Sequence, residues 1–149
     1  MSAPRHLDVR IRLLTEGAKV PAQQFATDAA LDLHAASDAH LEPFARAAVP
    51  TGVAVSIPEG YAGLVLPRSG LASKHGITLA NAPGLIDPGY TGEIKVILVN
   101  LDSRAAYDVR AGDRIAQLMI VESLGTRWHE VESLDDTDRG PRGFGSTGA

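Results

Sequence analysis

Hydrophobic residues recur at every second position in several short stretches, and this period constrains the fold more than any other feature of the sequence. Residues 7–13 and 53–57 place Leu, Val or Ile at alternate positions. A period of two is typical of a β-strand with one buried face. Residues 93–101 and 114–121 carry aliphatic and β-branched residues on both faces, which predicts central strands that are covered on both sides.

Turn signals rich in Gly, Pro and Asp separate these stretches at short intervals. They are Glu16-Gly17, Pro50-Thr51-Gly52, Pro67 to Gly70, Pro83-Gly84, Asp87-Pro88-Gly89 and Ala111-Gly112-Asp113. Only residues 23–26 and 70–74 suggest helical turns, and both segments are short. Many short strands joined by such turns predict an all-β fold, either a sandwich, a jelly roll or a barrel.

The length of 149 residues predicts a single domain, because domains commonly contain about 100 to 200 residues. Residues 135–149 differ in character, since they are rich in Asp, Arg and Gly and contain one large apolar residue, Phe144. Such a segment cannot bury enough apolar surface to fold by itself. We therefore expect a domain over residues 1–134 and a flexible, glycine-rich C-terminal tail over residues 135–149.

Composition argues against several classes of function. The chain has no cysteine, which removes disulfides, thiolate nucleophiles and zinc–thiolate sites. Its net charge of −4 argues against a general nucleic-acid or anionic-membrane surface. No apolar run reaches the roughly 18 residues of a membrane-spanning helix, and the first residues do not resemble a signal peptide. We expect a cytoplasmic protein without nucleic-acid or membrane partners.

The motifs argue against a nucleophilic side chain or a histidine metal cage. The five histidines form no H-x-x-H or H-x-x-x-H pair, and no serine lies in G-x-S-x-G. Any hydrolysis should therefore use water directly. Residues 143–148 match G-x-G-x-x-G, but a dinucleotide site needs a following helix, and a single residue follows here. The N–H groups and hydroxyls of this segment, with Arg139 and Arg142 beside them, still suit phosphate oxygens.

Three further segments bring polar groups together. Residues 67–70 combine a guanidinium, a hydroxyl and a small residue. Residues 81–90 form a hairpin-like excursion that brings Asp87 close to Tyr90, although Asp before Pro-Gly is also a good turn residue. Arg114 and Gln117 lie three apart on a predicted strand, so they point to opposite faces unless a bulge intervenes.

Together these segments resemble the five motifs of the trimeric dUTPase family, in the family's order and over nearly the whole chain. The matching segments are residues 27–35, 67–72, 84–93, 112–118 and 139–148. Five motifs in order are far more specific than any one of them.

The resemblance implies an all-β jelly-roll fold of the dUTPase-like β-clip type, and a homotrimer with active sites shared between subunits. It implies a dUTP diphosphatase, an enzyme of nucleotide metabolism that hydrolyses dUTP to dUMP and pyrophosphate with Mg²⁺. Such an enzyme limits the incorporation of uracil into DNA and supplies dUMP for thymidylate synthesis.

The resemblance also implies roles for individual residues. Asp87 is expected to be the general base for the water that attacks the α-phosphorus, and Asp32 to reach magnesium through water. The expected uracil and deoxyribose contacts are Asn81, Gly84, Leu85, Ile86, Tyr90 and Phe144. The expected phosphate contacts are Arg68, Ser69, Gly70, Gln117, Arg139, Gly145, Ser146 and Thr147.

Two positions depart from the family pattern. Ala30 stands where the first motif usually has Gly, and Pro141-Arg142 replaces a pair that usually ends in Gly. We expect the tail to close over the nucleotide nonetheless, with Phe144 on the uracil ring. Two alternatives stay open: a dCTP deaminase of the same superfamily, alone or combined with dUTP hydrolysis, and a jelly-roll protein that binds a nucleotide without cleaving it.

Overall fold

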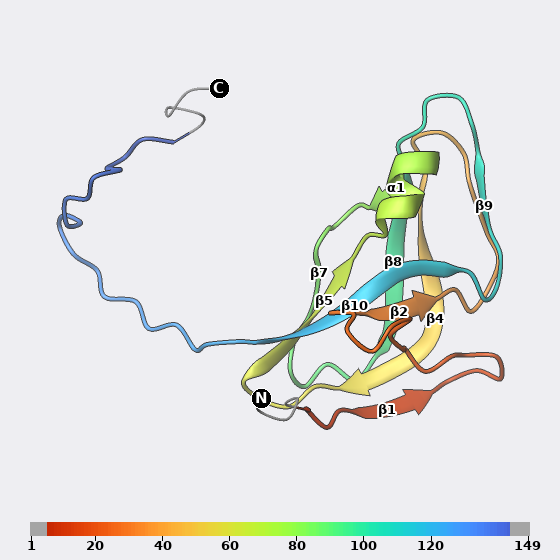
Figure 1. Cartoon of the computed structure of the whole chain (residues 1–149), viewed down its shortest axis with the longest axis horizontal. Coiled ribbons are helices and arrows are strands. Elements are labelled where there is room, and N and C mark those ends of the chain that lie inside the picture. The colour runs from red at the N-terminus through yellow and green to blue at the C-terminus, as the bar shows by residue number, and fades with distance from the viewer. Residues whose placement is uncertain (1–5, 144–149) are drawn as a thin grey trace.

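The computed structural model describes residues 6–143 and shows a chain built mainly of β-strands (Figure 1). The strands are β1 (Arg10–Leu13), β2 (Leu31–His34), β3 (Ala39–Leu41), β4 (Arg46–Ser56), β5 (Tyr61–Leu66), β6 (Ile77–Leu79), β7 (Gly84–Ile86), β8 (Glu93–Asn100), β9 (Tyr107–Val109) and β10 (Arg114–Glu122). One short helix, α1 (Ser69–His75), lies between β5 and β6. The all-β prediction is confirmed.

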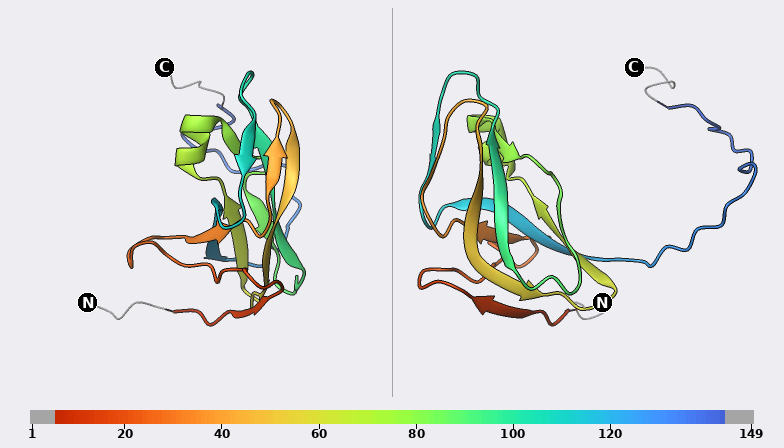
Figure 2. Two further views of the ribbon diagram at one scale, coloured as in Figure 1. Left: turned by 90° about the vertical axis from the view of Figure 1, so that its right-hand side faces the viewer. Right: turned by 180° about the vertical axis from the view of Figure 1, so that it is seen from behind.

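The strands form two four-stranded sheets and one two-stranded ribbon, with antiparallel pairing throughout. The order is β1-β4-β8-β6 in the first sheet and β2-β10-β5-β7 in the second, while β3 pairs with β9. From β4 to β8, each successive strand joins the other sheet, so the chain crosses between the sheets repeatedly (Figure 2). The connections between these strands therefore run from one sheet to the other, and α1 lies in the connection from β5 to β6.

Alternating apolar residues build the core between the two sheets. In β8, Ile94, Val96 and Leu98 are buried, whereas Lys95 is exposed and Ile97 is half-buried. The buried row packs into one cluster with apolar residues of β2, β4, β5 and β10. The prediction of central strands is confirmed for β8 and β10, but the prediction that both faces are covered is wrong for a single chain.

The predicted turn at Pro50-Thr51-Gly52 is wrong, because these residues lie inside β4. The register between β4 and β8 shifts at this point. The Thr51 hydroxyl donates a hydrogen bond to the Ile94 carbonyl (2.6 Å), and Gly52 takes a φ of 68°. These residues therefore form an irregularity within a long strand, as a β-bulge does.

The two predicted helical turns have different outcomes. Residues 70–74 lie within α1, which ends at Gly76 in the left-handed region, with a φ of 65°. Residues 23–26 form no helix, because Asp28 closes a tight turn by donating its N–H to the Phe25 carbonyl (2.9 Å). Within residues 6–143, no helix has the length and apolar character needed to cross a membrane.

Residues 123–143 contain no strand or helix and lead away from the sheets after β10 (Figure 1). Their large apolar side chains are exposed, with exposed fractions of 88% for Leu124, 88% for Trp128 and 87% for Leu134. Apolar surface of this extent on a segment outside the core is typical of a surface that binds another protein.

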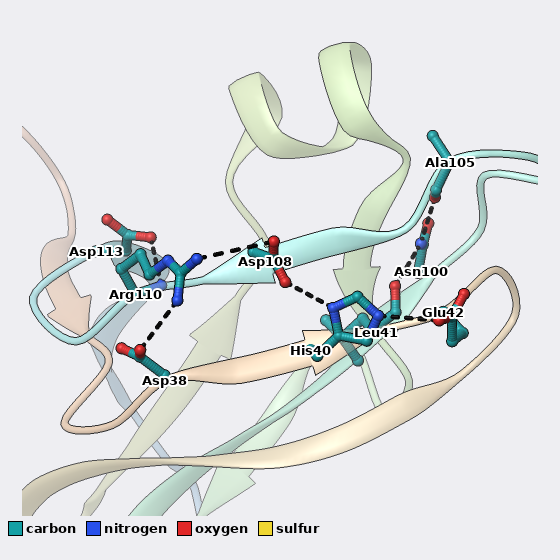
Figure 3. A network of polar contacts seen from close by, with 9 residues as sticks. All are labelled: Asp38, His40, Leu41, Glu42, Asn100, Ala105, Asp108, Arg110 and Asp113. Carbon is teal, nitrogen blue, oxygen red and sulfur yellow. Dashed lines mark hydrogen bonds and ion pairs between the residues drawn. The ribbon is translucent and has the colours of Figure 1, made fainter.

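Charged side chains connect the two strands of the β3–β9 ribbon on its exposed face (Figure 3). His40 lies between Asp108 (Nδ1 to Oδ1, 2.6 Å) and Glu42 (Nε2 to Oε1, 3.0 Å). Arg110 pairs with Asp38 at 3.1 Å. Hydrogen bonds to Asp108 and then to Glu42 raise the pKa of His40, and the bond to His40 lowers the pKa of Asp108.

We expect this cluster to stabilise the fold only over a limited range of pH. The contribution of His40 is fully present below the ordinary histidine pKa of 6.5 and is lost as the pH rises through its raised folded pKa. The contribution of Asp108 is present above the ordinary Asp pKa and is lost as the pH falls through its lowered folded pKa. The free energy of unfolding, measured with urea at fixed protein concentration, should therefore differ most between wild type and His40→Gln at pH values above the ordinary Asp pKa and below 6.5.

His129→Gln is the control, because His129 is exposed in the segment after β10. It should not reproduce this pH dependence. A difference between wild type and His40→Gln that stays constant across the whole pH range would contradict the prediction.

Candidate active site

The hairpin that contains β7 forms a wall of a cleft of about 140 Å³, which we call the hairpin cleft. Both sheets contribute to it. Its lining residues are Val65, Leu79, Asn81, Gly84, Leu85, Ile86, Tyr90, Glu93, Ile94, Lys95, Val96 and Ile97. The five hairpin residues that the sequence predicts to contact uracil and deoxyribose therefore lie together at one cleft.

Gly84 allows the hairpin to approach β5 closely. Gly84 pairs with Val65 in the β5–β7 register. A Cβ added at Gly84 would lie 3.2 Å from the Val65 Cβ and 3.4 Å from the Asn81 Nδ2. The absence of a side chain thus leaves room for the Asn81 amide and exposes the backbone edge of the hairpin to the cleft.

Tyr90 is held over Gly92 at the end of the hairpin. Its hydroxyl donates a hydrogen bond to the Glu93 carbonyl (3.0 Å). A Cβ at Gly92 would lie only 2.6 Å from the Tyr90 hydroxyl oxygen, so a side chain at this position would displace the ring. Gly92 and the hydrogen bond to Glu93 thus allow the tyrosine ring to lie at the wall of the cleft.

Asp87 directly follows β7 and begins a tight turn. The Tyr90 N–H donates a hydrogen bond to the Asp87 carbonyl (3.2 Å), and Gly89 takes a φ of 88°. The predicted proximity of Asp87 and Tyr90 is confirmed. Asp87 is exposed, so its carboxylate is accessible to water.

A second cleft, of about 340 Å³, lies where the loop before β2, the start of α1 and β10 meet. We call it the arginine cleft, after Arg68 and Arg114 in its wall. Its lining residues are Gln24, Phe25, Asp28, Ala29, Ala30, Asp32, Arg68, Arg114 and Gln117. The predicted phosphate contacts Arg68 and Gln117 thus lie beside the predicted magnesium residue Asp32.

Asp32 is a buried carboxylate between two guanidinium groups, and only 6% of the residue is exposed. Arg114 Nη1 donates a hydrogen bond to Oδ2 (3.3 Å), and Arg68 Nε lies 4.0 Å from Oδ1. Arg68 also donates from Nη1 to the Arg114 carbonyl (2.9 Å). These contacts position both arginines at the cleft and leave other N–H groups of their side chains for an anion.

His34 lies two residues after Asp32 on the same strand and carries no charge at neutral pH. Burial and the positive charge of Lys19 lower its pKa. Its Nδ1 is buried and has no hydrogen-bond partner among residues 6–143. The neutral imidazole therefore adds no positive charge beside the Asp32 carboxylate.

A bulge in β10 places Arg114 and Gln117 at the same cleft. Arg114 pairs with His34, but Ala116 already pairs with Leu33, so Ile115 is an extra residue in the register. Without this shift, two residues three apart on a strand would face opposite sides of the sheet. Because of the bulge, Arg114 and Gln117 both line the arginine cleft although they are three residues apart.

Ser69 and Gly70 begin α1 immediately after Arg68, and both are exposed. Neither is among the residues that line the arginine cleft in the described part of the chain. A Cβ at Gly70 would meet no atom within 4 Å. The start of the helix is therefore open next to the arginine cleft.

One chain does not bring all the predicted site residues together. Among residues 6–143, the two clefts share no lining residue. Arg139 lies in the segment that leaves the sheets, where its Nε donates a hydrogen bond to the Arg142 carbonyl (3.1 Å). The remaining predicted contacts lie outside the described residues; they are Phe144, Gly145, Ser146 and Thr147.

Six residues of the arginine cleft are missing from the site predicted by sequence: Gln24, Phe25, Asp28, Ala29, Ala30 and Arg114. The backbone bridge between Ala22 and Asp32 brings their loop back against β2. The sequence signal available for the loop was its position just before Asp32. For Arg114 the signal was its spacing from Gln117. This spacing indicates a shared cleft only if β10 contains a bulge.

The dUTPase family model matches residues 16–148. A deoxyuridine 5'-triphosphate nucleotidohydrolase of Rhodococcus erythropolis is 48% identical over 143 residues, which cover 96% of this chain and 87% of the relative. The enzyme of the same name from Tropheryma whipplei is 46% identical over 138 residues, which cover 93% and 94% of the two chains.

Solved structures show the same similarity. A mutant dUTPase of Staphylococcus bacteriophage 80alpha with dUpNHpp superposes with a TM-score of 0.89 and 32% identity, over 95% of this chain and 99% of that one. A mutant dUTPase from phage phi11 of S. aureus, whose structure concerns the coordination of a structural Mg(II) ion, gives a TM-score of 0.80 and 32% identity, over 87% and 99%. The predicted dUTPase-like jelly roll is confirmed. By motif order, fold and sequence identity over nearly its whole length, this chain belongs to the dUTPase family.

Proposed function

We propose that this enzyme hydrolyses dUTP to dUMP and pyrophosphate, with Asp87 as the general base for the attacking water. The observation that carries the proposal is the hairpin: it lines one cleft with all five expected nucleoside contacts within the described residues and places Asp87 in the turn after β7. In the reaction, the water oxygen bonds to the α-phosphorus, the bond to the bridging oxygen of the pyrophosphate breaks, and Asp87 accepts the proton of the water.

The hairpin is suited to select both the base and the sugar. A backbone edge presents fixed donors and acceptors, so a cytosine in place of uracil would leave buried polar groups unpaired. Tyr90, held by Glu93 and packed over Gly92, lies where deoxyribose would bind and would exclude a 2′-hydroxyl. We expect the same hairpin to exclude the additional methyl group of thymine.

The arginine cleft fits a magnesium ion that arrives with the triphosphate. Asp32 Oδ1 lies beyond hydrogen-bonding distance of Arg68 Nε, so it can accept a hydrogen bond from a metal-bound water. Residues 6–143 contain no cluster of three or more His, Asp or Glu that could hold a metal, and Mg²⁺ commonly uses one or two carboxylates with substrate phosphates. When bound, the ion would neutralise charge on the phosphate oxygens, beside Arg68, Gln117, Ser69 and Gly70.

We propose that the enzyme is a homotrimer whose active sites combine residues of different subunits. Two observations support this. The hairpin cleft and the arginine cleft are separate in one chain. The segment after β10 exposes Leu124, Trp128 and Leu134, which would be buried against another copy.

Residues 135–149 would act as a lid on the bound nucleotide. Arg139, Gly145, Ser146 and Thr147 would contact the phosphates and Phe144 the uracil ring. The product dUMP would serve thymidylate synthesis, and removal of dUTP would limit uracil in DNA.

A pyrophosphate-release assay with dUTP, UTP, dCTP and dTTP tests the proposed reaction. We expect rapid release from dUTP alone, because the hairpin reads the base and Tyr90 excludes the ribose hydroxyl. Release of ammonia from dCTP would support a deaminase instead. Binding of dUTP without release from any nucleotide would support a binding protein.

Asp87→Asn tests the general base. The amide cannot accept the proton but still suits the turn, so we expect dUTP binding to persist and kcat to fall by about 10²- to 10⁴-fold. Titration with dUpNHpp and steady-state kinetics measure the two quantities. Asp102→Asn is the matched control, because Asp102 is also a turn carboxylate but lies outside both clefts. Activity that persists in Asp87→Asn would show that Asp87 is only a turn residue.

Two truncations separate the lid from assembly. Removal of residues 139–149 should abolish most turnover and leave the trimer intact, because Leu124, Trp128 and Leu134 remain. Removal of residues 123–149 should also lower the oligomeric mass. Kinetics and light scattering measure both effects, and an unchanged kcat/KM in the shorter truncation would refute the lid.

A further inference from the structure

Gln24 lies in the arginine cleft, and none of the five motifs includes it. The motif nearest to it begins at Thr27. In the structure Gln24 lines the cleft together with Asp32 and Arg114. Its position is therefore close enough to influence phosphate binding, although the family pattern gives it no role.

The loop around Gln24 is held in place by its own hydrogen bonds. The Phe25 N–H donates to Asp28 Oδ2 (2.9 Å), and the Asp28 N–H donates to the Phe25 carbonyl (2.9 Å). The side-chain amide of Gln23 donates to the Asp28 carbonyl. The Asp32 N–H donates to the Ala22 carbonyl (2.9 Å), which anchors the start of the loop to β2.

Gln24 uses its side chain differently from Gln23, because it accepts a hydrogen bond from an arginine of the cleft. Arg114 Nη1 donates to Gln24 Oε1 at 2.9 Å and to Asp32 Oδ2 at 3.3 Å. Within residues 6–143, Arg114 Nε and Nη2 take no hydrogen bond to the protein. These N–H groups are available to an anion in the cleft.

The shorter of the two contacts is the one to Gln24, and it adds a second restraint to a guanidinium that Asp32 also holds. The Arg114 side chain is 40% exposed, and an arginine loses rotamer entropy when it is held in one conformation, so a second acceptor helps to keep it in place. A neutral amide supplies the second acceptor without adding a negative charge to a cleft that already contains Asp28 and Asp32. Electrostatic repulsion of a polyphosphate is thereby kept low.

We propose that Gln24 is a positioning residue that holds the Arg114 guanidinium ready for the polyphosphate part of the nucleotide. The inference rests on the proposed function, in that the arginine cleft receives the phosphates of dUTP. It assigns Gln24 an effect on phosphate affinity and none on recognition of the base, because the base is bound in the hairpin cleft.

Gln24→Met removes the acceptor and keeps a side chain of similar length. We expect it to weaken magnesium-dependent binding of dUpNHpp, and to raise KM for dUTP, by about threefold to tenfold, as expected for one partly exposed hydrogen bond to a charged group. The inhibition constant of deoxyuridine, which has no phosphate, should not change. The melting temperature should also stay near that of wild type, because the bonds within the loop remain.

Gln23→Met is the matched control, since it removes a glutamine at the adjacent position that bonds only within the loop. It should leave dUpNHpp affinity near wild type. An equal loss in both variants, a parallel loss of deoxyuridine binding, or unchanged dUpNHpp affinity in Gln24→Met would each overturn the proposal. Titration with inorganic tripolyphosphate and magnesium tests the same contact without turnover, so the result can be separated from a failure of the proposed reaction.

Discussion

The buried carboxylate of Asp32 is the interaction on which the arrangement of the arginine cleft depends. A buried carboxylate is costly unless it is paired, and loss of one partner of such a group commonly costs about 3–5 kcal/mol. Asp32 therefore requires Arg68 from the end of β5 and Arg114 from β10 to remain beside it. The same requirement fixes two guanidinium groups on the wall of a cleft, where an isolated arginine on a loop would be free to move.

The fold was largely predictable because the period of two is a local signal. Alternation in residues 53–57 identified part of β4, and the run of aliphatic and β-branched residues at 93–101 identified β8. The failure at residues 50–52 has a clear physical reason. Pro50-Thr51-Gly52 has the composition of a turn, but pairing with β8 and the bond from Thr51 to Ile94 keep it in a strand. Tertiary pairing outweighed local preference there.

The residues themselves could predict the grouping of candidate site residues at one cleft only where those residues are close in sequence, whereas Asp32, Arg68 and Gln117 were expected from the family resemblance. Asn81, Gly84, Leu85, Ile86 and Tyr90 lie on one hairpin, so a motif in the sequence corresponds directly to a cleft. The arginine cleft is assembled from three distant segments, and its content depends on the bulge in β10 and on the loop before β2. Gln24 was unpredictable, because its partner is Arg114, 90 positions away in the sequence.

In the proposed trimer, the separation of the two clefts would link catalysis to association. If each active site takes its hairpin from one subunit and its arginines from another, an isolated chain has both halves of the machinery but no complete site. Turnover per chain then depends on protein concentration: it is constant while the subunits stay together and falls on dilution below their dissociation constant. Such an enzyme is inactive as a newly made, unassembled chain and acquires activity only through assembly.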